Sequence, residues 1–286
     1  MKSLEVLETG PLATVQDLGR PGQAALGVGR SGAADAASLR LGNRLLRNDD
    51  DSAGIEVTYG GLAVRAHGDL LVALTGARCP ATVAGRCVGS NSPVLLPDGA
   101  ELRLGAPATG LRTYLTVRGG VDVAPVLGSR STDVLAGLGP EVLAPGSELP
   151  VGPCPRRQPT VDLAPVPDPP SGEVQLRVVR GPRADWFTDE AFDRLTAAPY
   201  EVTNESDRVG MRLRGAALER VRSEELPSEG MVPGALQVPP TGQPTLFLVD
   251  HPVTGGYPVL GVVVTTDLGR AAQVRPGQTI HFKEMR

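Results

Sequence analysis

The chain has 286 residues and a formal net charge of −4 at neutral pH, with 32 acidic and 28 basic side chains. That balance, and the lack of any basic run interleaved with aromatic residues, argue against nucleic-acid binding. Glycine (36 residues) and proline (27 residues) are abundant while aromatic residues make up only 3%, which predicts many short strands and turns rather than long helices.

No targeting or membrane segment is expected. The N-terminus lacks an apolar stretch before a small-residue cleavage site, and no apolar run reaches 18 residues, so we expect a soluble cytoplasmic protein without a membrane partner. The three cysteines, Cys79, Cys87 and Cys154, have no metal-like spacing, and no metal ligands are predicted among them.

Strands and one helix are predicted in the first half. A strand is expected over residues 4–8. Apolar residues at helical spacing predict a helix over residues 34–46, with Ser31 near its N-cap. Short runs rich in Val, Leu and Thr, separated by Gly-Asp and Asp-Gly turns, predict further strands over residues 70–75, 93–96, 101–104 and 113–118.

A proline-rich stretch divides the chain. Residues 153–172 favour an extended linker, because proline removes backbone donors. The predicted domains are therefore a first half over 1–152 and a second half over 173–286. In the second half we expect a helix over residues 185–197 and strands over 245–249 and 259–264.

The two halves share a series of short patterns in the same order. Gly-Pro after a strand recurs at 10–11 and 181–182, and Asn-x-x-Asp-x-x-Gly-apolar recurs at 48–55 and 204–211. Pro-Val-Leu-Gly follows at 125–128 and 258–261, and Pro-Gly-x-x-apolar at 145–149 and 276–280. The shared order predicts a duplication into two mainly antiparallel barrels, with a ligand cleft between the halves.

Polar residues gather in glycine-bearing loops rather than in core patterns. The segment DHPVTGGYP over residues 250–258 lies between two apolar runs, and its double glycine allows close backbone approach to a ligand. SDRVGMRL over 206–213 places an Asp and two Arg around a glycine, and arginine suits bidentate recognition of carboxylate or phosphate. Residues 228–244, QDLGR at 16–20 and the RGG segment at 118–120 add further polar side chains.

Several standard catalytic motifs are absent from the sequence. There is no GxxxxGK[ST] phosphate loop, no HExxH or CxxC pair and no GxSxG elbow. The histidines are His67, His251 and His281. We expect His67 in a surface turn and His281 in a structural strand position, which leaves His251 as the one histidine inside a suspected site.

Six blocks together resemble a known family. TVQDLGRPG, SGAAD, RGGVDVAPVLGSRST, SDRVGMRLRG, SEGMVPGALQVPPTGQP and DHPVTGGYP resemble the signature segments of the KipA family, also called allophanate hydrolase subunit 2 or the C-type subunit of 5-oxoprolinase. They are also similar to one half of the carboxyltransferase domain of urea carboxylase. One departure is visible, because the family often has two threonines before GGYP and Val253 takes the first of these positions here.

The resemblance implies a fold, partners and an activity. The implied fold is mainly β, with two duplicated cyclophilin-like β-barrel subdomains that each carry a helix. The implied partners are a KipI-like B-type subunit and a LamB/YcsF-like A-type subunit. The implied activity is ATP-dependent cleavage of 5-oxo-L-proline to L-glutamate, with ATP and Mg²⁺ bound at the level of the complex and arginines stabilising developing charge.

Site residues follow from the segments that match. Arg208 and Arg118 would hold a carboxylate or phosphate, and Asp250 or Glu229 would handle a proton or Mg²⁺. Gln237 would hydrogen-bond an amide together with Tyr257. The predicted catalytic set is Asp207, Arg208, Glu229 and Asp250, and the predicted substrate-binding set is Asp17, Arg20, Arg118, Gln237, Thr254, Gly255, Gly256 and Tyr257.

Two alternative functions remain open from the sequence. The first is a biotin-dependent carboxyltransferase acting on urea or a similar small amide. The chain has no biotin-carrying Met-Lys segment, so a separate carrier of carboxybiotin would be required. The second is a regulatory role, in which a KipA-like protein binds its KipI partner and antagonises a kinase inhibitor.

Overall fold

The computed structural model describes residues 2–285, which fold into two compact units. The first unit comprises residues 2–20, Ser31–Asp133 and Gly137–Pro169. The second comprises Pro21–Arg30, Val134–Ala136 and residues 170–285. The main division along the chain thus falls within the proline-rich stretch, and two short segments of the first half belong to the second unit.

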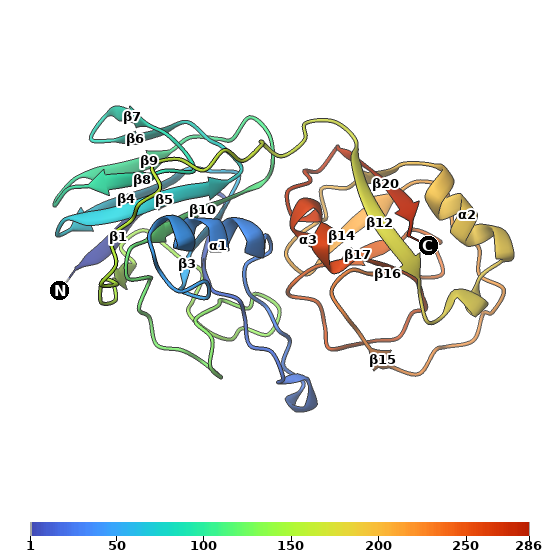
Figure 1. The fold of residues 1–286 in the computed structure, drawn as a ribbon. Coiled ribbons are helices and arrows are strands. Elements are labelled where there is room, and N and C mark those ends of the chain that lie inside the picture. Colours follow the sequence, from blue (N-terminus) through green and yellow to red (C-terminus); the bar gives the residue numbers. More distant parts are fainter. Residues whose placement is uncertain (1, 286) are drawn as a thin grey trace. The chain divides into compact units, whose positions relative to one another are not determined.

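The first unit contains two sheets and one α-helix, α1 (Ala36–Leu45) (Figure 1). One sheet has the strand order β11-β1-β4-β9-β6-β7, with bounds β1 Ser3–Thr9, β4 Leu62–His67, β6 Ala81–Val83, β7 Arg86–Val88, β9 Glu101–Leu104 and β11 Glu148–Pro150. The other has the order β2-β3-β10-β5-β8, with bounds β2 Leu12–Gln16, β3 Gly54–Thr58, β5 Leu70–Gly76, β8 Pro93–Leu96 and β10 Arg112–Val117.

Apolar residues alternate along these strands, so that one face of each strand packs into the core of the first unit. In β1, Leu4 and Val6 are fully buried while their neighbours are partly exposed, as expected where side chains point to opposite faces of a sheet. The turn between β6 and β7 uses Ala84 and Gly85, both at positive φ, the backbone that a two-residue hairpin requires. The core of the first unit is therefore built from many short strands.

A buried polar network fixes the loop that leads into α1. The Tyr114 hydroxyl donates to Glu56 Oε2 at 2.7 Å and accepts from the backbone N–H of Asp35, also at 2.7 Å. Glu56 lies 3.3 Å from Arg112 Nε. Burial, followed by the charge of Glu56, raises the pKa of Tyr114 well above its ordinary value, so the phenol stays protonated and keeps donating.

The second unit is a closed barrel with the strand order β12-β19-β16-β17-β14-β13-β20 (Figure 1). The strand bounds are β12 Val174–Arg180, β13 Tyr200–Val202, β14 Gly210–Arg214, β16 Ala235–Gln237, β17 Thr245–Phe247, β19 Val259–Val263 and β20 Thr279–Glu284. Closure leaves the barrel without an unpaired edge. A separate two-stranded ribbon joins β15 (Glu229–Gly230) to β18 (Thr254–Gly255).

Helices flank the barrel of the second unit. The helix α2 (Asp189–Ala197) buries Phe192 and Leu195 in the same apolar cluster as strand residues of the barrel. The helix α3 (Thr265–Ala271) is tied to β12, because buried Asp267 accepts from the Arg177 backbone N–H and guanidinium at 2.8 to 3.0 Å. One carboxylate thus fixes the position of α3 against its neighbouring strand.

The mainly-β class with a helix in each half is confirmed. Hydrogen bonds close the barrel of the second unit, whereas the strands of the first unit form two sheets. The strands predicted over residues 93–96 and 101–104 match β8 and β9, and the predicted helices match α1 and α2 within a few residues at their N-terminal ends. The predicted helix cap is wrong, because Asp35 rather than Ser31 accepts from the Ser38 N–H.

The repeated patterns correspond only in part. Gly54 begins β3 and Gly210 begins β14, so the Asn-x-x-Asp-x-x-Gly pattern precedes a strand in both halves. The equivalence of 125–128 with 258–261 is wrong at the level of secondary structure. Residues 125–128 form a loop with one isolated bridge, whereas residues 259–261 lie on β19, because Pro and Gly mark turns and strand ends alike.

Two remaining expectations concern histidine and membranes. His67 ends β4 rather than lying in a turn, while His281 lies on β20 and its Nε2 is 2.9 Å from the Thr196 carbonyl oxygen. Over residues 2–285, no helix combines the length and the apolar character that crossing a membrane demands.

The Arg177–Asp267 contact predicts a pH-dependent stability. Hydrogen bonds from Arg177 hold the pKa of Asp267 below its ordinary value, so the ionised form stabilises the fold. This contribution is complete above the unfolded pKa of about 3.9 and is lost as pH falls below it toward the folded pKa. Urea unfolding should show Asp267→Asn less stable than wild type at neutral pH, with the difference shrinking in acid.

The matched control for this measurement is Asp193→Asn on α2. Asp193 is 78% exposed and lies 3.9 Å from Arg180, so its replacement should change stability little at any pH. A wild-type advantage over Asp267→Asn that stays constant into acid would contradict the role given to this carboxylate.

Candidate functional site

The glycine-bearing loop over residues 250–258 connects β17 to β19 in the second unit. Its centre forms β18, which pairs antiparallel with β15, so that Gly255 lies opposite Glu229 and Thr254 opposite Gly230. The backbone N–H of Met231 also donates to the Val253 carbonyl oxygen at 2.9 Å. Two segments that the sequence predicts as separate polar loops therefore lie side by side.

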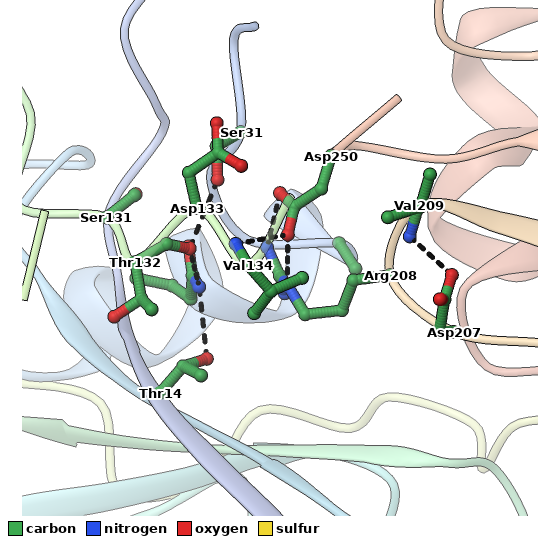
Figure 2. A network of polar contacts seen from close by, with 12 residues as sticks. Thr14, Ser31, Ser131, Thr132, Asp133, Val134, Asp207, Arg208, Val209 and Asp250 are labelled. Carbon is green, nitrogen blue, oxygen red and sulfur yellow. Dashed lines mark hydrogen bonds and ion pairs between the residues drawn. The ribbon is translucent and has the colours of Figure 1, made fainter. Parts of the chain in front are cut away.

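An ion pair between Arg208 and Asp250 holds the start of this loop (Figure 2). Arg208 Nε is 2.9 Å from Asp250 Oδ2 and Arg208 Nη2 is 3.1 Å from Oδ1, and the two side chains are 1% and 0% exposed. The Val134 N–H donates to Asp250 Oδ2 at 3.3 Å. A buried charge is costly unless it is paired, so each of these two residues requires the other.

Asp207 plays a different part from its neighbour Arg208. Its Oδ1 accepts from the backbone N–H of Val209 at 2.8 Å (Figure 2) and from that of Gly210 at 3.0 Å, and the residue is exposed. An Asp that accepts from the N–H two residues on stabilises a turn. Its carboxylate thus shapes the 206–213 segment in which it lies.

Glu229 is paired with an arginine that the sequence analysis missed. Arg183 Nε lies 2.9 and 3.0 Å from the two Glu229 carboxylate oxygens, and Arg183 Nη2 also donates to Oε1. These hydrogen bonds lower the pKa of Glu229 below its ordinary value. Glu229 is therefore ionised near neutral pH and is a weak proton acceptor.

Gln237 and the end of the loop form a second contact. Gln237 Nε2 donates to the Tyr257 carbonyl oxygen at 3.0 Å. A Cβ atom at Gly255 would lie 2.6 Å from Gln237 Nε2 and 3.0 Å from the Met231 sulfur, so a larger residue there would displace the ends of these two side chains. At Gly256, by contrast, the nearest heavy atom would be the Leu226 carbonyl oxygen at 3.7 Å.

Two hydroxyl groups on the loop face solvent. Tyr257 is 47% exposed and Thr254 is also exposed. Within the described chain, residues 2–285, neither hydroxyl has a hydrogen-bond partner. These are the groups of the loop that can contact a ligand without first giving up an internal bond.

His251 supplies the loop with an imidazole ring. The residue is 7% exposed, and its Nδ1 lies 2.8 Å from the Pro252 carbonyl oxygen. A carbonyl oxygen only accepts, so the contact places a proton on Nδ1. In the tautomer that carries no second proton, Nε2 is an acceptor. The ring packs beside Phe247 with centroids 6.5 Å apart.

Asp17 and Arg20 hold a loop of the first unit. Asp17 Oδ1 accepts from the Ser129 and Ser131 hydroxyls at 2.6 Å, and Oδ2 accepts from the Arg130 N–H at 2.6 Å. Arg20 is 2% exposed and donates to the carbonyl oxygens of Val126 and Ser131. Both side chains are thus engaged in fixing residues 126–131.

Arg118 holds another segment of the first unit. Its Nη2 donates to the carbonyl oxygens of Pro155 and Arg157 at 2.8 Å, and its Nη1 donates to Gln158 Oε1 at 2.5 Å. The guanidinium therefore clamps the start of the proline-rich stretch. These bonds engage both terminal nitrogens of the guanidinium that the sequence predicts for a substrate carboxylate or phosphate.

The site residues of the second unit do not form a metal centre by themselves. Among residues 2–285, no group of three or more His, Cys, Asp or Glu side chains is arranged to hold a metal ion. Asp250 and Glu229 each form an ion pair with an arginine, and the arginine already balances the charge that would attract Mg²⁺. The site is built from hydroxyl, amide and imidazole groups on a scaffold held by ion pairs.

These features define a class of protein, namely a mainly-β polypeptide with a closed barrel and a polar loop site that positions a ligand. A family model described as "Carboxyltransferase domain, subdomain A and B" matches residues 26–284, and the chain belongs to this family. It is 36% identical to the C-type subunit of 5-oxoprolinase from Escherichia coli over 98% of this chain and 90% of the relative.

Solved structures show the same fold at moderate sequence identity. The crystal structure of the urea carboxylase of Kluyveromyces lactis has a TM-score of 0.93 at 29% identity, and it covers 99% of this chain but 27% of its own. A crystal structure titled TTHA0988 has a TM-score of 0.90 at 35% identity. This chain spans 56% of the TTHA0988 chain, so the larger proteins contain further parts.

The buried ion pair predicts a large stability effect. Arg208→Ala leaves the Asp250 carboxylate buried without the arginine that balances its charge, which should cost about 3–5 kcal/mol of unfolding free energy. Denaturant titration followed by circular dichroism measures this loss. The double variant Arg208→Met/Asp250→Leu removes both charges and should be more stable than Arg208→Ala.

The control is Arg212→Ala on β14. Arg212 is 61% exposed and its Nε lies 3.5 Å from Glu205, so its loss should change stability by about 0.5 kcal/mol or less. Wild-type stability for Arg208→Ala would contradict the scaffold role of the pair.

Proposed function

We propose that this chain is the C-type component of a multi-subunit enzyme that converts 5-oxo-L-proline to L-glutamate with hydrolysis of ATP. The observation that carries the proposal is the 36% identity with the C-type component of a 5-oxoprolinase over nearly the full length of both chains. The proposed partners are a KipI-like B-type subunit and a LamB/YcsF-like A-type subunit. The proposed location of the complex is the cytoplasm.

The composition of the loop site supports a role in substrate recognition. A five-membered lactam presents a planar amide with one donor and one acceptor. The Tyr257 hydroxyl and the Thr254 hydroxyl are exposed, and His251 Nε2 is an acceptor in the neutral ring. These groups match the lactam without disturbing the internal pairs of Asp250 and Glu229.

The proposed reaction divides between the polypeptides of the complex. Transfer of a phosphoryl group from ATP to the lactam oxygen releases ADP and activates the ring carbon. Water then attacks that carbon, the bond to nitrogen breaks, and phosphate leaves as the carboxylate of glutamate forms. Because the carboxylates of this loop site do not fit Mg²⁺, we assign the site of MgATP chemistry to another polypeptide.

In this proposal, Arg208, Asp207 and Glu229 are positioning residues rather than acids or bases. Arg208 and Asp250 fix the ends of the two loops, and Glu229 binds Arg183 beside β18. Gln237 holds the Tyr257 backbone and thereby places the phenol. Asp17, Arg20 and Arg118 order loops of the first unit.

A reconstituted complex tests the main proposal. This chain, mixed with its B-type and A-type partners, is supplied with 5-oxo-L-proline and MgATP, and glutamate is followed over time. Glutamate should form only when all three polypeptides are present. Absence of turnover with folded, associated partners would rule the proposal out.

The exposed hydroxyl groups provide a sharper test. Tyr257→Phe and Thr254→Val should each lower kcat/KM of the reconstituted complex on the order of tenfold, as expected for one lost hydrogen bond to a ligand. Neither should change the unfolding midpoint, because these hydroxyls make no internal hydrogen bond. Thr241→Val, at an exposed position of the second unit, is the matched control and should retain full activity.

A second candidate is a biotin-dependent carboxyltransferase that acts on urea or a similar small amide. The fold match with the K. lactis urea carboxylase, at a TM-score of 0.93, favours it. It requires carboxybiotin on a separate carrier. Carboxylation of urea by the reconstituted complex, without glutamate formation, would replace the main proposal.

A tight complex with the KipI-like partner and neither activity would instead support the regulatory role.

A further inference from the structure

A pocket in the first unit gathers four arginines away from the loop site. It has a volume of about 350 Å³ and is lined by the end of α1 and by the segment that follows β11. The lining residues are Arg44, Arg47, Asn48, Asp49, Pro155, Arg156 and Arg157. The volume falls within the range of small-molecule sites, about 300–1,000 Å³.

The charges in this pocket are only partly balanced. Arg44 forms a bidentate pair with Asp50, at 2.8 and 2.5 Å. In the part of the chain that the structure describes, Arg47, Arg156 and Arg157 form no ion pair with an acidic side chain. Asp49 is the one carboxylate among the lining residues, so the pocket keeps a net positive charge.

Two separate sets of hydrogen bonds hold the segments that carry these arginines around the pocket. Arg47 adopts positive φ (59°) just after α1, and its guanidinium donates to the Thr160 hydroxyl. The buried Arg118 clamps the backbone at Pro155 and Arg157. Stabilisation of the helix end accounts for basic residues on α1, but it does not account for two more on a separate, clamped segment.

We propose that this pocket binds a phosphate group of a small anionic ligand. Planar guanidinium groups bind phosphate oxygens in pairs, and they do so best where the backbone has already ordered them. The volume exceeds that of phosphate alone, so the ligand carries a further moiety, and Asp49 selects against ligands whose negative charge covers the whole molecule. The site is independent of the proposed 5-oxoprolinase function.

Calorimetry on the full chain tests the site with three probes, namely inorganic phosphate, pyrophosphate and ATP without metal, at constant ionic strength. All three should bind with one site per chain, and ATP should bind most tightly if the further moiety is a nucleoside. Pyrophosphate as the tightest probe would contradict the further moiety and the selection by Asp49. No binding of any probe at millimolar concentration would overturn the proposal.

Arginine variants locate the site. Arg47→Ala and the pair Arg156→Ala/Arg157→Ala should each weaken binding on the order of tenfold or more. The control Arg86→Ala removes one exposed arginine of β7, carries the same charge change as Arg47→Ala and should leave the affinity unchanged. Equal weakening by Arg86→Ala would show that general charge attraction, not the pocket, binds the probe.

Two further measurements exclude misfolding of the variants and binding of an acidic partner as explanations. Thermal unfolding in the absence of probe must match wild type for each variant, and Arg47→Lys replaces Arg47→Ala if the latter does not fold. Competition with poly-glutamate distinguishes the phosphate site from a docking site for an acidic partner. Tight binding of poly-glutamate together with no binding of the phosphate probes would overturn the proposal.

Discussion

The ion pair between Arg208 and Asp250 is the constraint on which the loop site depends. Both side chains are almost completely removed from water, and two buried charges are tolerated only when each satisfies the other. The pair joins the 206–213 segment to the start of the 250–258 loop, and the Val134 N–H binds the same carboxylate. Thr254 and Tyr257 lie on the loop that begins at this pair, and β15 and Gln237 hold their backbone.

The pairing of charged groups also limits the acid–base chemistry that the polypeptide can perform. Glu229 is held ionised by Arg183, and Asp17 accepts from two serine hydroxyls and two backbone N–H groups. Carboxylates held by such contacts stabilise loops and are poor general acids or bases. What remains for a ligand is a set of hydroxyl, amide and imidazole groups, which suits a polypeptide that binds substrate while a partner completes the reaction.

Much of the fold and the location of the candidate site were predictable from the sequence. Alternating Val and Leu indicated the strands, and the 3.6-residue spacing indicated α1. Residues 228–244 and 250–258 were predicted as polar loops, and the pairing of β15 with β18 brings the two segments together. The contacts of individual residues were not predictable: Arg183 lies 46 positions from Glu229, and Ser131 lies 114 positions from Asp17.

The sequence by itself determined the strand-rich class, the helices α1 and α2, the positions of the loops and the family, because these follow from local periodicity and from ordered motifs. The helix α3 (Thr265–Ala271) was not predicted. Only the tertiary structure decided which charges are scaffold and which groups face solvent. The sequence predicts Arg208 and Arg118 as ligand-binding arginines, yet Arg208 pairs with the buried Asp250 and Arg118 donates to the carbonyl oxygens of Pro155 and Arg157. The physical reason is that the state of an ionisable group depends on burial and on partners brought near by folding, and neither quantity is present in a local pattern of residues.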